Sequence, residues 1–177
     1  MRRKTDFAFK RESCAPLARE NLQNENQSRP CVILAIEDDP EDVEILRLAL
    51  SQKTAVCKIV AVQFARDAIK YLGRIGEYAD EKKFPRPTSI VLDLSLPGMS
   101  GMEFLTWARG EPDIPPIVVL TYSKLEENRV LAEKLGAKGY FTKSVDLKET
   151  AAVIETLLAL STPPQISPES HQSTQNF

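Results

Sequence analysis

The chain has 177 residues, of which 42% are hydrophobic and 27% charged, and its formal net charge is −2. This length suits one domain of ordinary size with flanking segments and argues against two large domains. The longest apolar run, CVILAI, covers only residues 31–36, whereas a membrane-spanning helix needs about 20 apolar residues. The basic residues 2–4 are followed by further charges and not by the apolar segment of a signal peptide. We therefore expect a cytoplasmic protein with no membrane span.

The cysteine and histidine content limits the chemistry available to the chain. The three cysteines, Cys14, Cys31 and Cys57, form no CxxC pair, and their odd number argues against a disulfide framework, so we expect them to be reduced. The one histidine, His171, lies near the end of a polar tail. A Ser-His-Asp triad or a HExxH zinc site would therefore lack its central residue. Any chemistry must rest on carboxylates, hydroxyls and lysines.

Two polar segments flank the central part of the chain. Residues 20–30 contain one apolar side chain, Leu22, and residues 161–177 are rich in Ser, Pro and Gln and contain no Lys or Arg. Such segments bury too little surface to offset the entropy lost on ordering. We predict disordered tails over residues 1–29 and 161–177, and one folded domain over residues 30–160.

Short apolar runs alternate with longer amphipathic segments within that central part. The apolar runs predict strands at residues 31–36, 56–64, 89–92, 117–120 and 140–142. The amphipathic segments predict helices at residues 40–50, 67–75, 101–109, 125–135 and 146–160, with a long polar loop at 76–88. Asp39 and Ser100 are the expected N-caps of the first and third helices. Five strands that alternate with five helices imply an α/β domain whose parallel sheet is covered on both faces.

Polar side chains follow the carboxyl ends of four of the five strands. In chain order they are Glu37, Asp38, Asp39, Asp93, Thr121 and Lys143. Each one alone is more often a cap, a turn residue or a solvated side chain, and we assign Asp39 to capping because Pro40 follows it. Ligands of open parallel sheets bind outside the carboxyl ends of the strands. Acids, a hydroxyl and an ammonium that converge there favour a functional site.

Four segments resemble the receiver domain of two-component response regulators, which accepts a phosphoryl group on an aspartate. They are ILAIEDD at residues 33–39, VLDLSLPGMSGMEFL at 91–105, VVLT at 118–121 and GAKGYFTK at 136–143. Their order and spacing match the family over residues 31–160. The start of the first helix and the long loop before Thr88 are most similar to the small stand-alone regulators of bacterial phytochromes and related histidine kinases. The resemblance implies one flavodoxin-like, doubly wound domain with five helices and strand order 2-1-3-4-5.

The resemblance also implies a role for each polar residue at the sheet edge. Asp93 matches the phosphoacceptor, Lys143 the phosphate-binding lysine, Thr121 the switch hydroxyl and Tyr140 the switch aromatic. In this scheme Lys143 neutralises charge on the incoming group and Thr121 donates a hydrogen bond to it. The alternative is that Tyr140 has no switch role and is a half-buried strand residue that packs locally.

The implied cofactor is Mg²⁺. Glu37 and Asp38 match the acidic pair of the family. Together with Asp93 and the backbone carbonyl of Ser95, they offer the oxygen ligands that Mg²⁺ prefers. The ion is expected to bridge Asp93 and a phosphoryl oxygen.

Two residues depart from the family's pattern. The position after Thr121 is commonly small, and here it is Tyr122, so we expect a ring that partly covers the site. The residue after Lys143 is usually a proline joined by a cis bond, and here it is Ser144. A cis bond before serine costs about 2.5 to 4 kcal/mol, against about 0.5 to 1 before proline. The loop therefore either relaxes to trans or is held cis.

Three functions follow from these residues. The leading one is a signalling module, not a metabolic enzyme, that is phosphorylated by a histidine kinase such as a phytochrome-type photoreceptor. It would signal to a downstream protein, or to a second copy as a homodimer, through its fourth helix, fifth strand and fifth helix. The alternative, favoured by Tyr122 and Ser144, is a scaffold that binds partners without efficient phosphorylation. A haloacid dehalogenase-type phosphatase is disfavoured because Ser95 stands where that family needs an aspartate, and the acidic core disfavours nucleic-acid binding.

Overall fold

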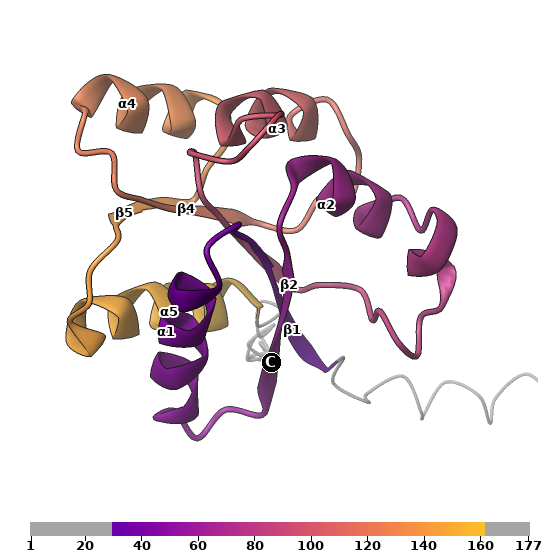
Figure 1. Cartoon of the computed structure of the whole chain (residues 1–177), viewed down its shortest axis with the longest axis horizontal. Helices are drawn as coiled ribbons and strands as arrows, with labels where there is room; N and C mark the ends of the chain where they lie inside the picture. The colour runs from indigo at the N-terminus through magenta and orange to yellow at the C-terminus, as the bar shows by residue number, and fades with distance from the viewer. Residues whose placement is uncertain (1–29, 162–177) are drawn as a thin grey trace, which may run out of the picture.

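Strands and helices alternate along residues 30–161, the part of the chain that the computed structural model describes (Figure 1). The strands are β1 (Cys31–Ile36), β2 (Cys57–Val62), β3 (Ser89–Leu92), β4 (Ile117–Thr121) and β5 (Gly139–Thr142). The helices are α1 (Pro40–Ser51), α2 (Ala65–Leu72), α3 (Gly101–Ala108), α4 (Glu126–Lys134) and α5 (Leu147–Ser161), with a 3-10 helix, η1 (Gly76–Ala79). The tails predicted to be disordered lie outside the described residues, except that Ser161 is the last residue of α5. No helix within 30–161 has the length and apolar character needed to cross a membrane.

The five strands form one parallel sheet in the order β2-β1-β3-β4-β5. This confirms the α/β fold predicted from the alternating pattern and the strand order implied by the resemblance. Side chains of β1 alternate between two hydrophobic layers: Leu34 and Ile36 pack on the side of α2, α3 and α4, whereas Ile33 and Ala35 pack on the side of α1 and α5. Figure 1 shows the same two helical layers, with α1 and α5 on one face of the sheet. Burial on both faces explains why the three central strands, β1, β3 and β4, are almost entirely apolar.

The segment around α2 differs from the sequence prediction. The helix begins at Ala65, two residues earlier than expected, and ends at Leu72. Arg74 and Gly76 then have positive φ angles of 59° and 65°, which a continuing helix does not allow. The expected polar loop contains η1 and an aromatic cluster, because the rings of Tyr78 and Phe84 pack 5.3 and 5.8 Å from that of Tyr71. Two aromatic residues thus anchor a stretch whose composition is otherwise polar.

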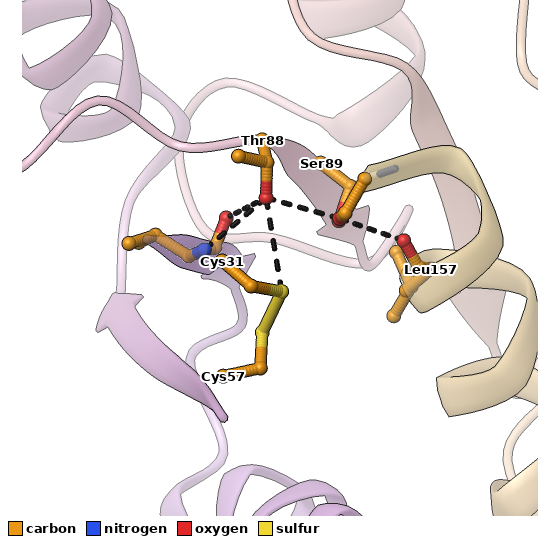
Figure 2. Close-up of a disulfide and its surroundings, with 7 residues drawn as sticks. Cys31, Cys57, Thr88, Ser89 and Leu157 are labelled. Carbon is orange, nitrogen blue, oxygen red and sulfur yellow. Dashed lines mark hydrogen bonds between the residues drawn. A yellow bond between two sulfur atoms is a disulfide. The ribbon is translucent and has the colours of Figure 1, made fainter. Parts of the chain in front are cut away.

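The cysteines contradict the expected reduced state. Cys31 and Cys57 are joined by a disulfide (Figure 2). They are the first residues of β1 and β2 and are paired directly in the register of these neighbouring strands, with their Cα atoms 4.5 Å apart. Spacing along the chain gave no sign of the bond, because it depends on the strand register. In the chain-entropy model a cross-link across a sequence separation of 26 contributes about 3.5 kcal/mol to stability.

Local backbone features hold the ends of β1 and β3 in place. Asp39 caps α1 as predicted, since its Oδ1 accepts a hydrogen bond of 2.8 Å from the backbone N–H of Glu41. Ser100 caps α3 as predicted, within a capping box that it forms with Glu103. At Gly101 a Cβ atom would overlap the backbone carbonyl of Asp93. The start of α3 can therefore pack directly against the end of β3 only because residue 101 has no side chain.

Candidate functional site

The sheet brings the predicted polar residues to one edge. Backbone hydrogen bonds extend the strand pairing one residue beyond three strand ends: Asp93 N–H donates to Ile36 O (3.0 Å), Glu37 N–H donates to Val62 O (3.0 Å) and Lys143 N–H donates to Thr121 O (2.9 Å). These bonds fix the backbone from which each functional side chain projects. Because β1, β3, β4 and β5 follow one another in the sheet, the side chains at their ends become neighbours.

The centre of this edge is a buried lysine surrounded by carboxylates. The Nζ atom of Lys143 lies 2.7 Å from Glu37 Oε2, 2.7 Å from Asp42 Oδ2 and 2.8 Å from Asp93 Oδ2. All four residues are at least nine-tenths buried. One ammonium therefore faces three carboxylates, and the cluster carries excess negative charge when all of them are ionised.

Burial and hydrogen bonding set the protonation of this cluster. Burial raises the pKa of Glu37 to about 7, even though the neighbouring Lys143 opposes that shift. Burial by itself would lower the pKa of Lys143, but hydrogen bonds and ion pairs with Asp42, Asp93 and Glu37 more than offset it and raise that pKa above its ordinary value. Lys143 is therefore protonated at neutral pH, while Glu37 titrates near neutrality.

Three carboxylates are placed to share a metal ion. Glu37, Asp38 and Asp93 each offer one oxygen, and these oxygens all lie within 4.8 Å of one another. Asp38 is exposed whereas the other two are buried, so the cluster opens to solvent at Asp38. Hard oxygen ligands and excess negative charge suit a divalent cation such as Mg²⁺. The Ser95 backbone is adjacent, because its N–H donates to Asp93 Oδ1 at 3.1 Å. The ligand role of its carbonyl stays a prediction.

Asp42 is a site residue that the sequence analysis missed. It lies in the first turn of α1, is buried, and contacts Lys143. Asp42 shares a buried helix face with Leu46, Ala49 and Leu50, at i+4, i+7 and i+8. An acidic residue on the apolar face of a predicted helix was therefore the available signal, since a buried carboxylate requires a charged or hydrogen-bonding partner.

Tyr122 extends across the lysine. Its hydroxyl donates to Asp42 Oδ1 at 3.1 Å, and its ring centre is 5.0 Å from Lys143 Nζ. The residue is still 62% exposed, so the ring covers the ammonium from the solvent side. Asp42 thus contacts both the lysine and the ring above it.

Ser144, the second departure from the family's pattern, follows a trans peptide bond, because no cis bond occurs within 30–161. Of the two alternatives expected for this loop, the structure has the trans peptide bond. In this conformation the Lys143 ammonium contacts Asp93.

Thr121 and Tyr140 are linked through the loop that follows β4. Thr121 is fully buried, and its Oγ1 accepts a hydrogen bond of 3.4 Å from the Ser123 N–H. Tyr140 is half-buried and its hydroxyl donates to Ser123 O at 3.0 Å. A displacement of this loop would therefore affect both side chains.

Comparisons with known proteins agree with this geometry. A family model described as the response regulator receiver domain matches residues 33–155. The curated response regulator Rcp1 of Synechocystis sp. is 31% identical over 134 residues, which are 75% of this chain and 89% of Rcp1. The crystal structure of the phosphorylated cyanobacterial phytochrome response regulator RcpA is similar, with a TM-score of 0.67, 31% identity and coverage of 76% of this chain and 98% of RcpA. The Mn²⁺-bound form of Rcp1 gives a TM-score of 0.65 and 32% identity over 76% of this chain and 98% of that structure.

The raised pKa of Glu37 predicts a specific pH dependence of stability. A carboxyl group whose pKa rises from 4.5 to about 7 on folding contributes stability below pH 4.5 and loses it as the pH rises toward 7. Glu37→Gln mimics the protonated form and should not show this loss. Its stability relative to wild type should therefore increase between pH 4.5 and 7, by on the order of 3 kcal/mol.

Urea denaturation at several pH values without divalent cations measures this difference. Glu77→Gln, at an exposed position in η1, is the matched control and should track the wild type. A difference between Glu37→Gln and wild type that stays constant with pH would contradict the assignment.

Proposed function

Because the chain belongs to the response regulator receiver domain family, we propose that it is a single-domain response regulator that accepts a phosphoryl group on Asp93 from a histidine kinase. Members of this family are generally signalling proteins and not metabolic enzymes. The observation that carries the proposal is the position of Asp93, which lies 2.8 Å from Lys143 and within a cluster of three carboxylates able to hold a cation.

Charge is the main obstacle to phosphorylation of a carboxylate. Asp93 and a phosphorylated donor are both negative, so they repel each other unless positive charge lies between them. Lys143 stays protonated and supplies one positive charge directly beside Asp93. Glu37, Asp38, Asp93 and the Ser95 carbonyl would hold Mg²⁺, which would supply a second positive charge beside Asp93. An Asp93 oxygen then bonds to phosphorus as the donor's leaving group departs.

The proposed response is a change in the surface near α4, β5 and α5. Thr121 would donate a hydrogen bond to the phosphoryl group, and Ser123 would move with it. Tyr140 would then lose its acceptor at Ser123 and turn inward. The support for this coupling is the pair of hydrogen bonds at Ser123. Exposed apolar side chains on or beside α4, namely Leu125, Val130 and Leu131, offer a contact surface for a downstream protein or a second copy of the chain.

The kinase is the first partner of such a module. RcpA is a phytochrome response regulator, and 76% of this chain resembles it. We therefore propose a histidine kinase of the phytochrome-type photoreceptor class as the phosphoryl donor.

A scaffold that binds partners without efficient phosphorylation is the second candidate. The observation in its favour is Tyr122, whose ring lies over Lys143 and is held there by Asp42. This arrangement restricts the approach of a donor to the ammonium.

Phosphorylation of Asp93 is the direct test of the proposed function. Incubation with acetyl phosphate and Mg²⁺ should add one phosphoryl group, detected by intact mass, and chelation of the metal should prevent it. Asp93→Asn should add none, because an amide is not a comparable nucleophile. Asp80→Asn, at an exposed position, should behave like wild type. Labelling that persists in Asp93→Asn would rule out this acceptor.

Mg²⁺ titration by calorimetry should distinguish Asp38, a member of the acidic pair, from its neighbour Asp39. Asp38→Ala should lose most of the Mg²⁺ affinity, because it removes the exposed ligand of the cluster. Asp39→Ala should leave the affinity nearly unchanged and lower stability by about 1 kcal/mol, since Asp39 caps α1. The opposite pattern would show that the metal ligands are displaced by one residue.

Replacement of Tyr122 distinguishes the two candidate functions. Tyr122→Phe keeps the ring but loses the hydrogen bond to Asp42, and Tyr122→Ala loses both. Both should phosphorylate faster with acetyl phosphate, by about two- to tenfold for the lost hydrogen bond and more for the lost ring, with little change in Mg²⁺ affinity. An inert wild type with an active Tyr122→Ala would favour the scaffold. Equal rates in all three proteins would show that the ring does not limit access.

A further inference from the structure

The Cys31–Cys57 disulfide lies at the amino ends of the strands, whereas the carboxylate cluster lies at their carboxyl ends. It joins the amino ends of β1 and β2, and both cysteines are half-buried. Figure 2 shows Thr88 and Ser89, at the amino end of β3, beside it. The proposed phosphorylation does not use this edge, so the sulfur atoms are open to a separate role.

A surface hollow gives access to one of the two sulfur-bearing residues. It has a volume of about 370 Å³ and is lined by residues of α1, β2 and the turn between them, which include Cys57 but not Cys31. A small molecule in this hollow therefore lies beside Cys57 and not beside Cys31. In thiol-disulfide exchange, access to each sulfur and the stability of the departing thiolate both influence which sulfur is attacked.

The charged residues that line the hollow are all basic. They are Arg47, Lys53 and Lys58. Arg47 and Lys53 pair with Glu44 and Glu155, whereas Lys58 forms no ion pair with another residue of the described domain. The hollow therefore keeps surplus positive charge and attracts anionic molecules in preference to cationic ones.

The other sulfur is placed to leave. The hydroxyl of Thr88 lies 3.9 Å from Cys31 Sγ, within reach to donate to it, and also within 3.0 Å of Val32 O and Ser161 Oγ. A hydroxyl has one proton, and a charged acceptor binds it more strongly than a neutral one. As negative charge develops on Cys31 Sγ, the Thr88 proton can turn toward it. The two sulfurs are thus chemically unequal.

We propose that Cys57 is a thiol-exchange site for an anionic low-molecular-weight thiol of the glutathione class. The thiolate forms a bond to Cys57 Sγ, the Cys31–Cys57 bond breaks, and the electron pair leaves on Cys31 as a thiolate. A second thiolate then attacks the small-molecule sulfur of the mixed disulfide, which releases Cys57 and the oxidised thiol. Two thiols are oxidised and one protein disulfide is reduced. Exchange thereby opens the loop 31–57, which contains Glu37, Asp38 and Asp42.

The first test locates the adduct. The full chain with Cys14→Ser, so that only the disulfide pair remains, is incubated with reduced glutathione, quenched with acid and mapped by peptide mass spectrometry. The expected product carries glutathione on Cys57 and a free thiol on Cys31. An adduct mainly on Cys31, an equal mixture, or a disulfide that does not react would overturn the proposal.

The second test measures the role of charge. Exchange rates with anionic glutathione and cationic cysteamine are each divided by the rate of the same thiol with a small neutral disulfide. In the wild type, the normalised exchange rate should be higher for glutathione than for cysteamine. This advantage, the ratio of the two rates, should fall about 1.5- to fivefold in Lys58→Gln and should also fall in high salt. Lys124→Gln, a lysine remote from the hollow in sequence and absent from its lining, is the control and should keep the full advantage. An advantage that is absent, or that is unaffected by Lys58→Gln and by salt, would overturn the basic hollow as the recognition element.

Discussion

The shared ammonium of Lys143 is the interaction around which the carboxyl edge of the sheet is organised. It joins carboxylates from the end of β1, the first turn of α1 and the end of β3, across sequence separations of 101 residues to Asp42 and 50 to Asp93. One buried cation cannot balance three buried anions, so the cluster either retains a proton, which the raised pKa of Glu37 favours, or gains a second cation. When all three carboxylates are ionised, the protein's own charges therefore favour a second cation at this site.

The sheet supplies the rigidity that this cluster requires. Glu37 and Asp93 follow β1 and β3, which are buried on both faces, and backbone hydrogen bonds continue the pairing up to Glu37, Asp93 and Lys143. The absence of a side chain at Gly101 lets α3 close against the backbone of Asp93. Apolar packing thus offsets the cost of holding like charges together, and the charged side chains lie where the apolar strands end.

Helix α1 connects the two edges of the sheet. Its first turn contributes Asp42 to the carboxylate cluster, and its last turns contribute Arg47, Leu50 and Ser51 to the basic hollow beside Cys57. The disulfide closes the loop that contains this helix. Breaking the cross-link would therefore act on the same β-α-β unit that supplies the acidic pair, through the stability of that unit and not through direct contact.

The sequence alone determined the features that depend on neighbouring residues. Short segments of the sequence are enough to predict the strand and helix periodicity, the Asp39 and Ser100 caps, and the acids after β1 and β3. The fold predicted from them is confirmed. Contacts between distant residues were decided by the tertiary structure. Asp42 meets Lys143 because of how α1 packs on the sheet, Tyr122 reaches Asp42 across 80 residues, and Cys31 meets Cys57 because β1 and β2 pair in one register. Local propensities act over a few residues, whereas these pairs depend on how separate elements pack against one another.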